Sequence, residues 1–121
     1  LATTYDANLA VIAARLGAGL DDLEAAASAL IARMGNAPAA ALTVAEPFLK
    51  LAGTVIGGWL MARAAKLAHE AVAAGSSDPF YVEKLASARF YTDHLLPRSS
   101  GLRITVESDN SLLLGLPDEA F

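Results

Sequence analysis

Cysteine is absent from the 121 residues of this chain. Disulfide frameworks, cysteine-based zinc sites and thiol nucleophiles are therefore excluded, although the absence leaves the redox compartment open. Histidine is scarce too, because His69 and His94 are the only two, and neither has a second histidine three or four residues away. A zinc site would need more ligands than these two side chains supply, so we expect no metal.

Basic clusters and long apolar runs are also missing. The net charge is −4 at pH 7, and no two Lys or Arg residues are adjacent, whereas nucleic-acid-binding proteins carry a basic patch. We therefore expect no nucleic-acid partner. The longest uncharged apolar-rich run, residues 51–62, is twelve residues long, and a bilayer-spanning helix needs about 20. A membrane span is not expected, because much of the apolar content is alanine, a strong helix former that need not be buried.

Signatures of catalysis are lacking as well. No glycine-rich phosphate loop, dinucleotide-binding fingerprint or nucleophile elbow is present. The carboxylates, among them Asp21, Asp22 and Glu24, fall on predicted outer faces or in loops. General acid–base chemistry needs a carboxyl group in an apolar pocket with a partner across the substrate. We therefore predict no catalytic, cofactor-binding or metal-binding residue in this chain.

Apolar periodicity, in contrast, runs along most of the chain. Residues 6–34 place an apolar side chain every three or four positions, which is typical of a helix with one buried stripe. Gly17 and Gly19 interrupt this stripe, and each costs about 1 kcal/mol relative to alanine. The stripe keeps its phase across them, so one long helix is expected. Gly35 as the C′ residue, followed by Pro38, then ends it.

A central helix is predicted over residues 43–74. Thr43 and Glu46 match a capping box in which Thr43 is the N-cap. Between residues 51 and 62 the helix is apolar all round, which is typical of a helix buried on most sides. We therefore expect this helix to form the middle of the core.

A third helix begins with Asp78 as N-cap and Pro79 as its first residue, the favoured start. Pro97 removes a backbone hydrogen bond, so the helix kinks or stops there and continues to about Glu107. The tail, residues 108–121, is expected to pack back as a short turn of helix. The fold class is therefore all-α, an antiparallel four-helix-bundle-like arrangement of three long helices plus a short C-terminal helix in a single domain.

Three glycines, Gly53, Gly57 and Gly58, lie close together in the central helix. Gly53 and Gly57 are four residues apart, so they share a helix face that another backbone can approach closely. Glycines at this density destabilise a helix unless contacts compensate. We consider three interpretations of this glycine face: it packs inside the domain, it meets a second subunit or domain, or it borders a ligand channel.

Arg63 lies in line with the apolar stripe of the central helix, where an unpaired charge is costly. It either pairs with Asp93 or extends its charged end to solvent. Trp59 is expected in the core, and Tyr81 and Tyr91 nearer its boundary, because a phenol needs a polar partner. The candidate interface and packing residues are Gly53, Gly57, Gly58, Trp59, Arg63, Tyr81 and Tyr91.

Two stretches carry a family resemblance: residues 47–65, PFLKLAGTVIGGWLMARAA, and residues 80–97, FYVEKLASARFYTDHLLP. Together they resemble the C-terminal extension domain of a branch of bacterial acyl-CoA dehydrogenases that includes the methylthiopropionyl-CoA dehydrogenase type. The interruption at Gly17 and Gly19 and the polar segment at residues 103–106 depart from the alanine-rich pattern of that branch.

The resemblance implies a parent enzyme that uses FAD to remove two hydrogens from an acyl-CoA thioester. In such enzymes a glutamate takes the α proton and the flavin takes the β hydride. Those groups belong to a catalytic core outside this chain, so no catalytic or flavin-binding residue is carried over. The chain, which begins at Leu1, is thus expected to be an inactive, cofactor-free C-terminal fragment of a cytoplasmic flavoenzyme.

The implied role is structural and oligomeric, with the parent's own catalytic core and a second subunit of a homodimer as partners. The substrate, an acyl-CoA, belongs to the parent. One alternative is a free-standing helical module that binds a small molecule or a protein segment in an apolar groove. Another is an independent small enzyme.

Overall fold

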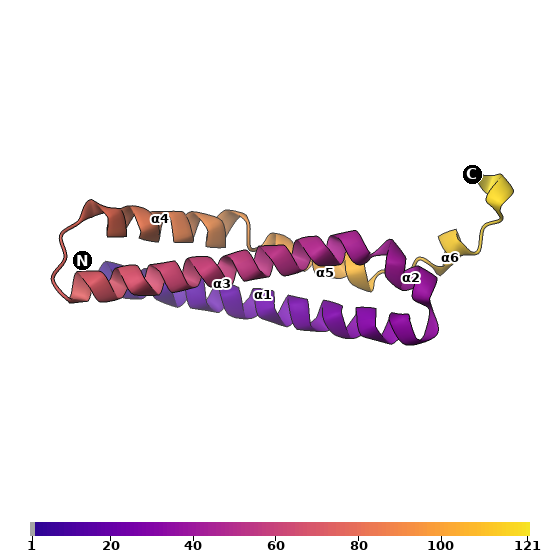
Figure 1. Ribbon diagram of the computed structural model, residues 1–121, viewed down its shortest axis with the longest axis horizontal. Coiled ribbons are helices and arrows are strands. Elements are labelled where there is room, and N and C mark those ends of the chain that lie inside the picture. Colours follow the sequence, from indigo (N-terminus) through magenta and orange to yellow (C-terminus); the bar gives the residue numbers. More distant parts are fainter. Residues whose placement is uncertain (1) are drawn as a thin grey trace.

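The computed structural model describes residues 2–121, with side chains from residue 6 onward. Three rods lie side by side in an elongated antiparallel bundle (Figure 1). They are α1 (Ala2–Asn36), α3 (Ala45–Ala73), and the pair α4 (Pro79–His94) and α5 (Arg98–Glu107). Short elements follow α1 and α5, namely α2 (Pro38–Thr43), α6 (Ser111–Leu114) and a 3-10 turn η1 (Asp118–Ala120). No strand occurs within residues 2–121, so the predicted all-α bundle is confirmed.

The core consists of two apolar clusters arranged along the bundle. One cluster contains Ile12, Ala65, Ala68, Leu85 and Ala88; the other contains Ala26, Val44, Leu51, Val55, Leu96 and Val106. Alanines are frequent in the first cluster, which lets the helices approach closely there, whereas valines and leucines dominate the second. Each cluster draws on α1, α3 and the α4–α5 rod, so no two of these rods form a core without the third.

Pro97 divides the third rod into α4 and α5, as predicted. At this break the side chain of Leu96 packs against α1 and α3. Leu96 is almost fully buried, at 1% exposure. A Cβ added at Gly19 or Gly58 would lie only 3.0 or 3.1 Å from its side chain. These two glycines therefore open space in α1 and α3 for one leucine. Gly17, the other glycine in the apolar stripe of α1, is exposed, and a Cβ there would meet no atom within 4 Å.

Helix boundaries confirm some predicted caps and correct others. Asp78 is the N-cap of α4, because its carboxylate accepts a hydrogen bond from the Phe80 N–H at 2.9 Å. The prediction of Gly35 as a C′ residue is wrong, because Gly35 lies within α1. Among the described glycines only Gly75, just after α3, has a positive φ, +102°.

The capping box at the start of the central helix is also wrong. Thr43 ends α2 instead, and its hydroxyl donates to the carbonyl of Ala40 at 2.7 Å. The reason is that Pro38 starts a separate short helix, which leaves Thr43 helical, whereas an N-cap needs a non-helical backbone. The residue that precedes α3 is Val44, and Glu46 pairs with Lys50 at 2.6 Å.

The C-terminal tail forms the short helix α6 but does not pack back along the bundle. It leaves beyond the α2 end (Figure 1), and Leu112 is 85% exposed. The turn is held there by two side chains: Asp109 accepts from the Ser111 N–H at 2.9 Å, and Asn110 donates to the hydroxyl of Thr43. These contacts direct the chain past the end of the bundle, so the expectation of a packed tail is wrong.

Candidate functional site

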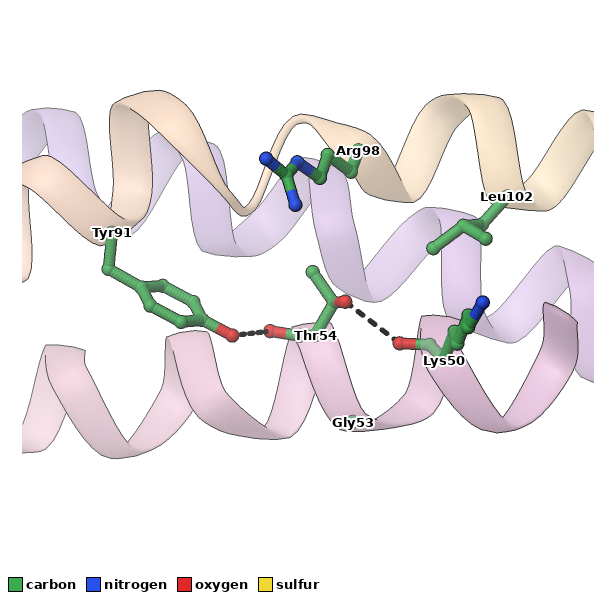
Figure 2. A pocket seen from close by; sticks show the side chains of 6 residues that line it. All are labelled: Lys50, Gly53, Thr54, Tyr91, Arg98 and Leu102. Atoms are coloured by element: carbon green, nitrogen blue, oxygen red, sulfur yellow. Dashed lines mark hydrogen bonds between the residues drawn. The ribbon is translucent and has the colours of Figure 1, made fainter. Parts of the chain in front are cut away.

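A depression of about 550 Å³ lies between α3 and the α4–α5 rod, where that rod is broken (Figure 2). Two cationic side chains, Lys50 and Arg98, stand along it, and Tyr91 closes one end. The depression is lined by Lys50, Gly53, Thr54, Tyr91, Arg98 and Leu102.

Tyr91 makes a hydrogen bond from α4 to α3 at one end of this depression. Its hydroxyl donates to the carbonyl of Thr54 at 2.7 Å. The ring reaches this carbonyl by crossing Gly57, where an added Cβ would overlap the hydroxyl. Burial raises the pKa of Tyr91 above its ordinary value of 10.0, because desolvation disfavours the phenolate. Gly57 thus serves packing within the domain, and the phenol stays protonated.

Two other polar groups around the depression, those of Lys50 and Thr54, make contacts within α3. The hydroxyl of Thr54 donates to the carbonyl of Lys50 at 2.8 Å, and the ammonium of Lys50 pairs with Glu46. None of the six lining residues is a carboxylate or an imidazole. A proton acceptor near neutral pKa, which general base catalysis requires, is therefore absent from this depression.

A buried polar cluster joins α1 to α5, and sequence reasoning missed it. Asp22 was expected on the outer face of its helix, but it is only 8% exposed. Its carboxylate accepts from Ser99 at 2.7 Å and from Ser100 and Arg103 at 3.3 Å. The available signal was its spacing, three residues after Gly19 on the buried side of α1. Because three donors satisfy this carboxylate, it acts as a structural acceptor.

Arg33 makes a second link between the same two helices. Its guanidinium donates to the carbonyls of Val106, Glu107 and Ser108 at 2.5, 2.7 and 2.8 Å. These carbonyls belong to the end of α5, where a helix has unsatisfied acceptors and partial negative charge. Arg33 is thus a C-terminal cap contributed by another helix.

The predicted pairing of Arg63 with Asp93 is wrong. Asp93 instead pairs with Arg89 at 2.9 Å, one helical turn away, and Arg89 also donates to Asn8 at 2.8 Å. Arg63 is exposed, and its guanidinium lies 5.0 Å from the ring centre of Trp59. The alternative expectation, a charged end in solvent, is what the structure shows.

Trp59 is likewise not a core residue, because 47% of it is exposed. Tyr81 is half-buried, as expected of a boundary residue, and packs edge-on against Phe80 at 5.5 Å. His94 is exposed and stacks on Phe90. Across the residues that the structure describes, no three His, Asp or Glu side chains lie together in a way that could hold a metal ion.

The central helix has an apolar side that no other part of the described chain covers. Leu49, Ile56, Leu60 and Leu67 are between 51% and 71% exposed. The expectation that α3 is buried on most sides is therefore wrong. We call this surface the outer face of α3 and define it by Leu49, Gly53, Ile56, Leu60, Arg63 and Leu67. Exposed apolar surface that is continuous along a helix is typical of a protein–protein contact.

The fold and these sites define a helical-bundle domain with an exposed apolar helix face, in which Asp22, Arg33 and Tyr91 make structural contacts between helices. The chain belongs to the family described as acetyl-CoA dehydrogenase C-terminal like, which matches residues 1–117. This match confirms the resemblance to C-terminal domains of acyl-CoA dehydrogenase-like proteins. No curated protein and no solved structure matches the chain. None of the described helices combines the length and apolarity that crossing a bilayer requires.

Proposed function

We propose that this chain is the C-terminal structural and oligomerisation domain of an FAD-dependent acyl-CoA dehydrogenase. In this proposal the parent is a cytoplasmic enzyme of the methylthiopropionyl-CoA dehydrogenase-like branch, and residues 1–121 are its last domain. The domain packs against the parent's catalytic core and contributes to a homodimer. The observation that carries this role is the exposed outer face of α3, in a chain whose family is that of acyl-CoA dehydrogenase C-terminal domains.

The residues of this chain do not fit a flavin. The depression in Figure 2 is open, and its one aromatic side chain, Tyr91, is held by the carbonyl of Thr54 rather than free to stack on a ring system. Glycine-rich backbone that could receive a pyrophosphate at a helix N-terminus is also absent from its lining. We therefore place FAD, the acyl-CoA and the dehydrogenation in the parent's core.

Purification of the 121-residue chain tests the division of roles. We expect a colourless protein that reduces no electron acceptor when acyl-CoA is supplied. Stoichiometric FAD, seen as visible flavin absorbance that survives gel filtration, would contradict the proposal. The parent polypeptide without these residues provides the converse test. It should retain flavin but contain fewer subunits per particle than the intact enzyme, beyond the loss of 12.5 kDa from each subunit.

A free-standing binding module is the second candidate, and the pair of cations along the depression favours it. Lys50 and Arg98 would suit an anionic small molecule. Native mass spectrometry distinguishes the two candidates, because a co-purified anionic ligand at stoichiometric occupancy supports the module. A ligand-free mass, together with a flavin-binding core encoded immediately before Leu1, supports the dehydrogenase domain.

A further inference from the structure

We infer that the outer face of α3 pairs with the same face of a second copy of this chain, with the two helices antiparallel. This inference rests on the proposed oligomerisation role and specifies the surface and the geometry that carry it. The occupant is a second copy because the face is apolar and self-complementary in its spacing, and its one charged residue, Arg63, favours antiparallel over parallel pairing.

The spacing of the outer face is that of a helix-pairing seam. Its residues follow one another at intervals of four, three, four, three and four, from Leu49 to Leu67. Alternation of this kind keeps one stripe directed at a partner helix, as in coiled coils. The stripe runs for about 27 Å at 1.5 Å per residue, and its apolar members are all at least half exposed.

Arg63 decides the direction of pairing. In a parallel pair in register, Arg63 would lie beside Arg63 of the second copy, and two like charges would meet in the seam. In an antiparallel pair centred between Ile56 and Leu60, Arg63 lies opposite Gly53 of the second copy. A Cβ at Gly53 would meet no atom within 4 Å, so this position has room for the arginine stem. The same glycine that looked suited to close approach thus receives the one charge of the stripe.

The remaining layers are apolar in the antiparallel arrangement. Leu49 lies opposite Leu67 of the second copy, and Ile56 lies opposite Leu60 of the second copy. Trp59 flanks the centre of the seam, so its exposed ring would be covered together with the Arg63 that stacks on it. Every large apolar side chain of the stripe therefore meets another apolar side chain.

Charges at the two ends of the stripe are compatible with this pairing. One end carries Glu46 and Lys50, 2.6 Å apart, and the other carries Lys66 and Glu70, 4.0 Å apart. In the antiparallel register Glu46 is level with Glu70 of the second copy and Lys50 with Lys66 of the second copy, while each of these charges keeps its partner of opposite sign on its own helix. Each end therefore holds two carboxylates and two ammonium groups and is neutral in sum, as it would be in a parallel pair, so the end charges permit the contact and Arg63 sets its direction.

The size of the contact sets the strength to expect. A seam one helix wide is smaller than the roughly 800 Å² per partner of a standard stable interface. The isolated chain should therefore form a reversible dimer whose population depends on concentration. In the parent enzyme, contacts from the catalytic cores would add to this seam.

Sedimentation equilibrium of the 121-residue chain, from about 10 μM to about 1 mM, tests the inference. We expect dimerisation in the wild type, loss of dimer in Leu60→Glu, and wild-type dimerisation in the control Ile104→Glu. Ile104 lies on α5, is 69% exposed and is outside the outer face. Because both substituted side chains are exposed, both variants should keep wild-type helicity and melting, which circular dichroism checks.

The possible outcomes distinguish a failure of the outer face as the interface from a failure of the proposed oligomerisation role. If the wild type dimerises and Leu60→Glu dimerises equally, the outer face is not the interface, and the oligomerisation role survives. A wild type that stays monomeric up to the highest concentration overturns this inference. It also shows that the domain alone does not join two subunits, which is the result expected if the outer face docks on the parent's catalytic core.

Cross-linking tests the direction, and the absence of cysteine makes single-cysteine variants unambiguous. Leu49→Cys and Leu67→Cys, treated with a short bis-maleimide, should give a cross-linked dimer only when the two proteins are mixed. Cross-linking of Leu49→Cys with itself would overturn the antiparallel arrangement. A cysteine at Ile104 serves as the matched control and should cross-link with neither.

Discussion

Two glycines of α3 should respond in opposite ways to the same substitution. Alanine is about 1 kcal/mol more favourable than glycine in a helix interior. At Gly53 nothing within 4 Å opposes an added Cβ, so Gly53→Ala should raise the free energy of unfolding by about that amount. At Gly57 the Cβ would overlap the Tyr91 hydroxyl and lie 2.9 Å from Cζ of the same ring.

The clash at Gly57 has two costs. The phenol must leave the Thr54 carbonyl, which removes a hydrogen bond worth about 1 kcal/mol. The half-buried ring must also shift, and overpacking of this kind costs about 1–3 kcal/mol. Set against the gain in helix propensity, Gly57→Ala should lower the free energy of unfolding by about 1–3 kcal/mol.

Urea unfolding followed by circular dichroism, at a protein concentration where the chain is monomeric, measures both variants. A further variant isolates the cause. In a Tyr91→Leu background the ring is gone, so Gly57→Ala should become stabilising, as it is at Gly53. Equal stabilisation by Gly53→Ala and Gly57→Ala in the wild-type background would refute the placement of Tyr91 across Gly57.

Further substitutions test Asp22, Thr92, Trp59 and Tyr91. Asp22→Ala removes the acceptor shared by two serines and an arginine and should cost about 1–3 kcal/mol in urea unfolding, whereas Asp21→Ala, at an exposed position, should cost less than about 0.5 kcal/mol. Thr92→Val should raise the melting temperature, because the Thr92 hydroxyl is fully buried and has no hydrogen-bond partner among the described residues, and a lower melting temperature would contradict this. Trp59→Ala should cost about 1 kcal/mol or less in the monomer, far from the 3–5 kcal/mol of a core tryptophan. Burial raises the pKa of the Tyr91 phenol, so the folded state favours the protonated form. The stability that this protonated phenol contributes is fully present below pH 10 and is lost as the pH rises through the folded-state pKa. The urea midpoint should therefore fall more between pH 9 and pH 11 in the wild type than in Tyr91→Phe.

Local signals in the sequence were sufficient for the three rods of this fold, but not for the short helix α2. The three- and four-residue spacing of apolar side chains predicted the three rods, and Asp78 and Pro97 marked a helix start and a break. These predictions hold because each depends on neighbours within one or two helical turns. The Thr43 capping box failed because Pro38 opened a competing helix just before it.

The residues of the candidate site were harder to place, because their surroundings come from distant parts of the chain. The sequence marked Gly57 and Tyr91 as packing or boundary residues, but only the packed structure put the ring of one across the other. Asp22 looked like an exposed helix residue until α5 brought three donors to it. An isolated helix pattern contains no information about donors 77 to 81 residues away.

The sequence by itself determined the helical character of the chain, the break at Pro97 and the family to which the chain belongs. Only the tertiary structure decided which side of the central helix is covered. Between residues 51 and 62 that helix is apolar all round, so its pattern does not distinguish an inner side from an outer one. Two neighbouring rods cover part of its circumference, and the stripe from Leu49 to Leu67 stays exposed because the described chain has no fourth long helix to place there.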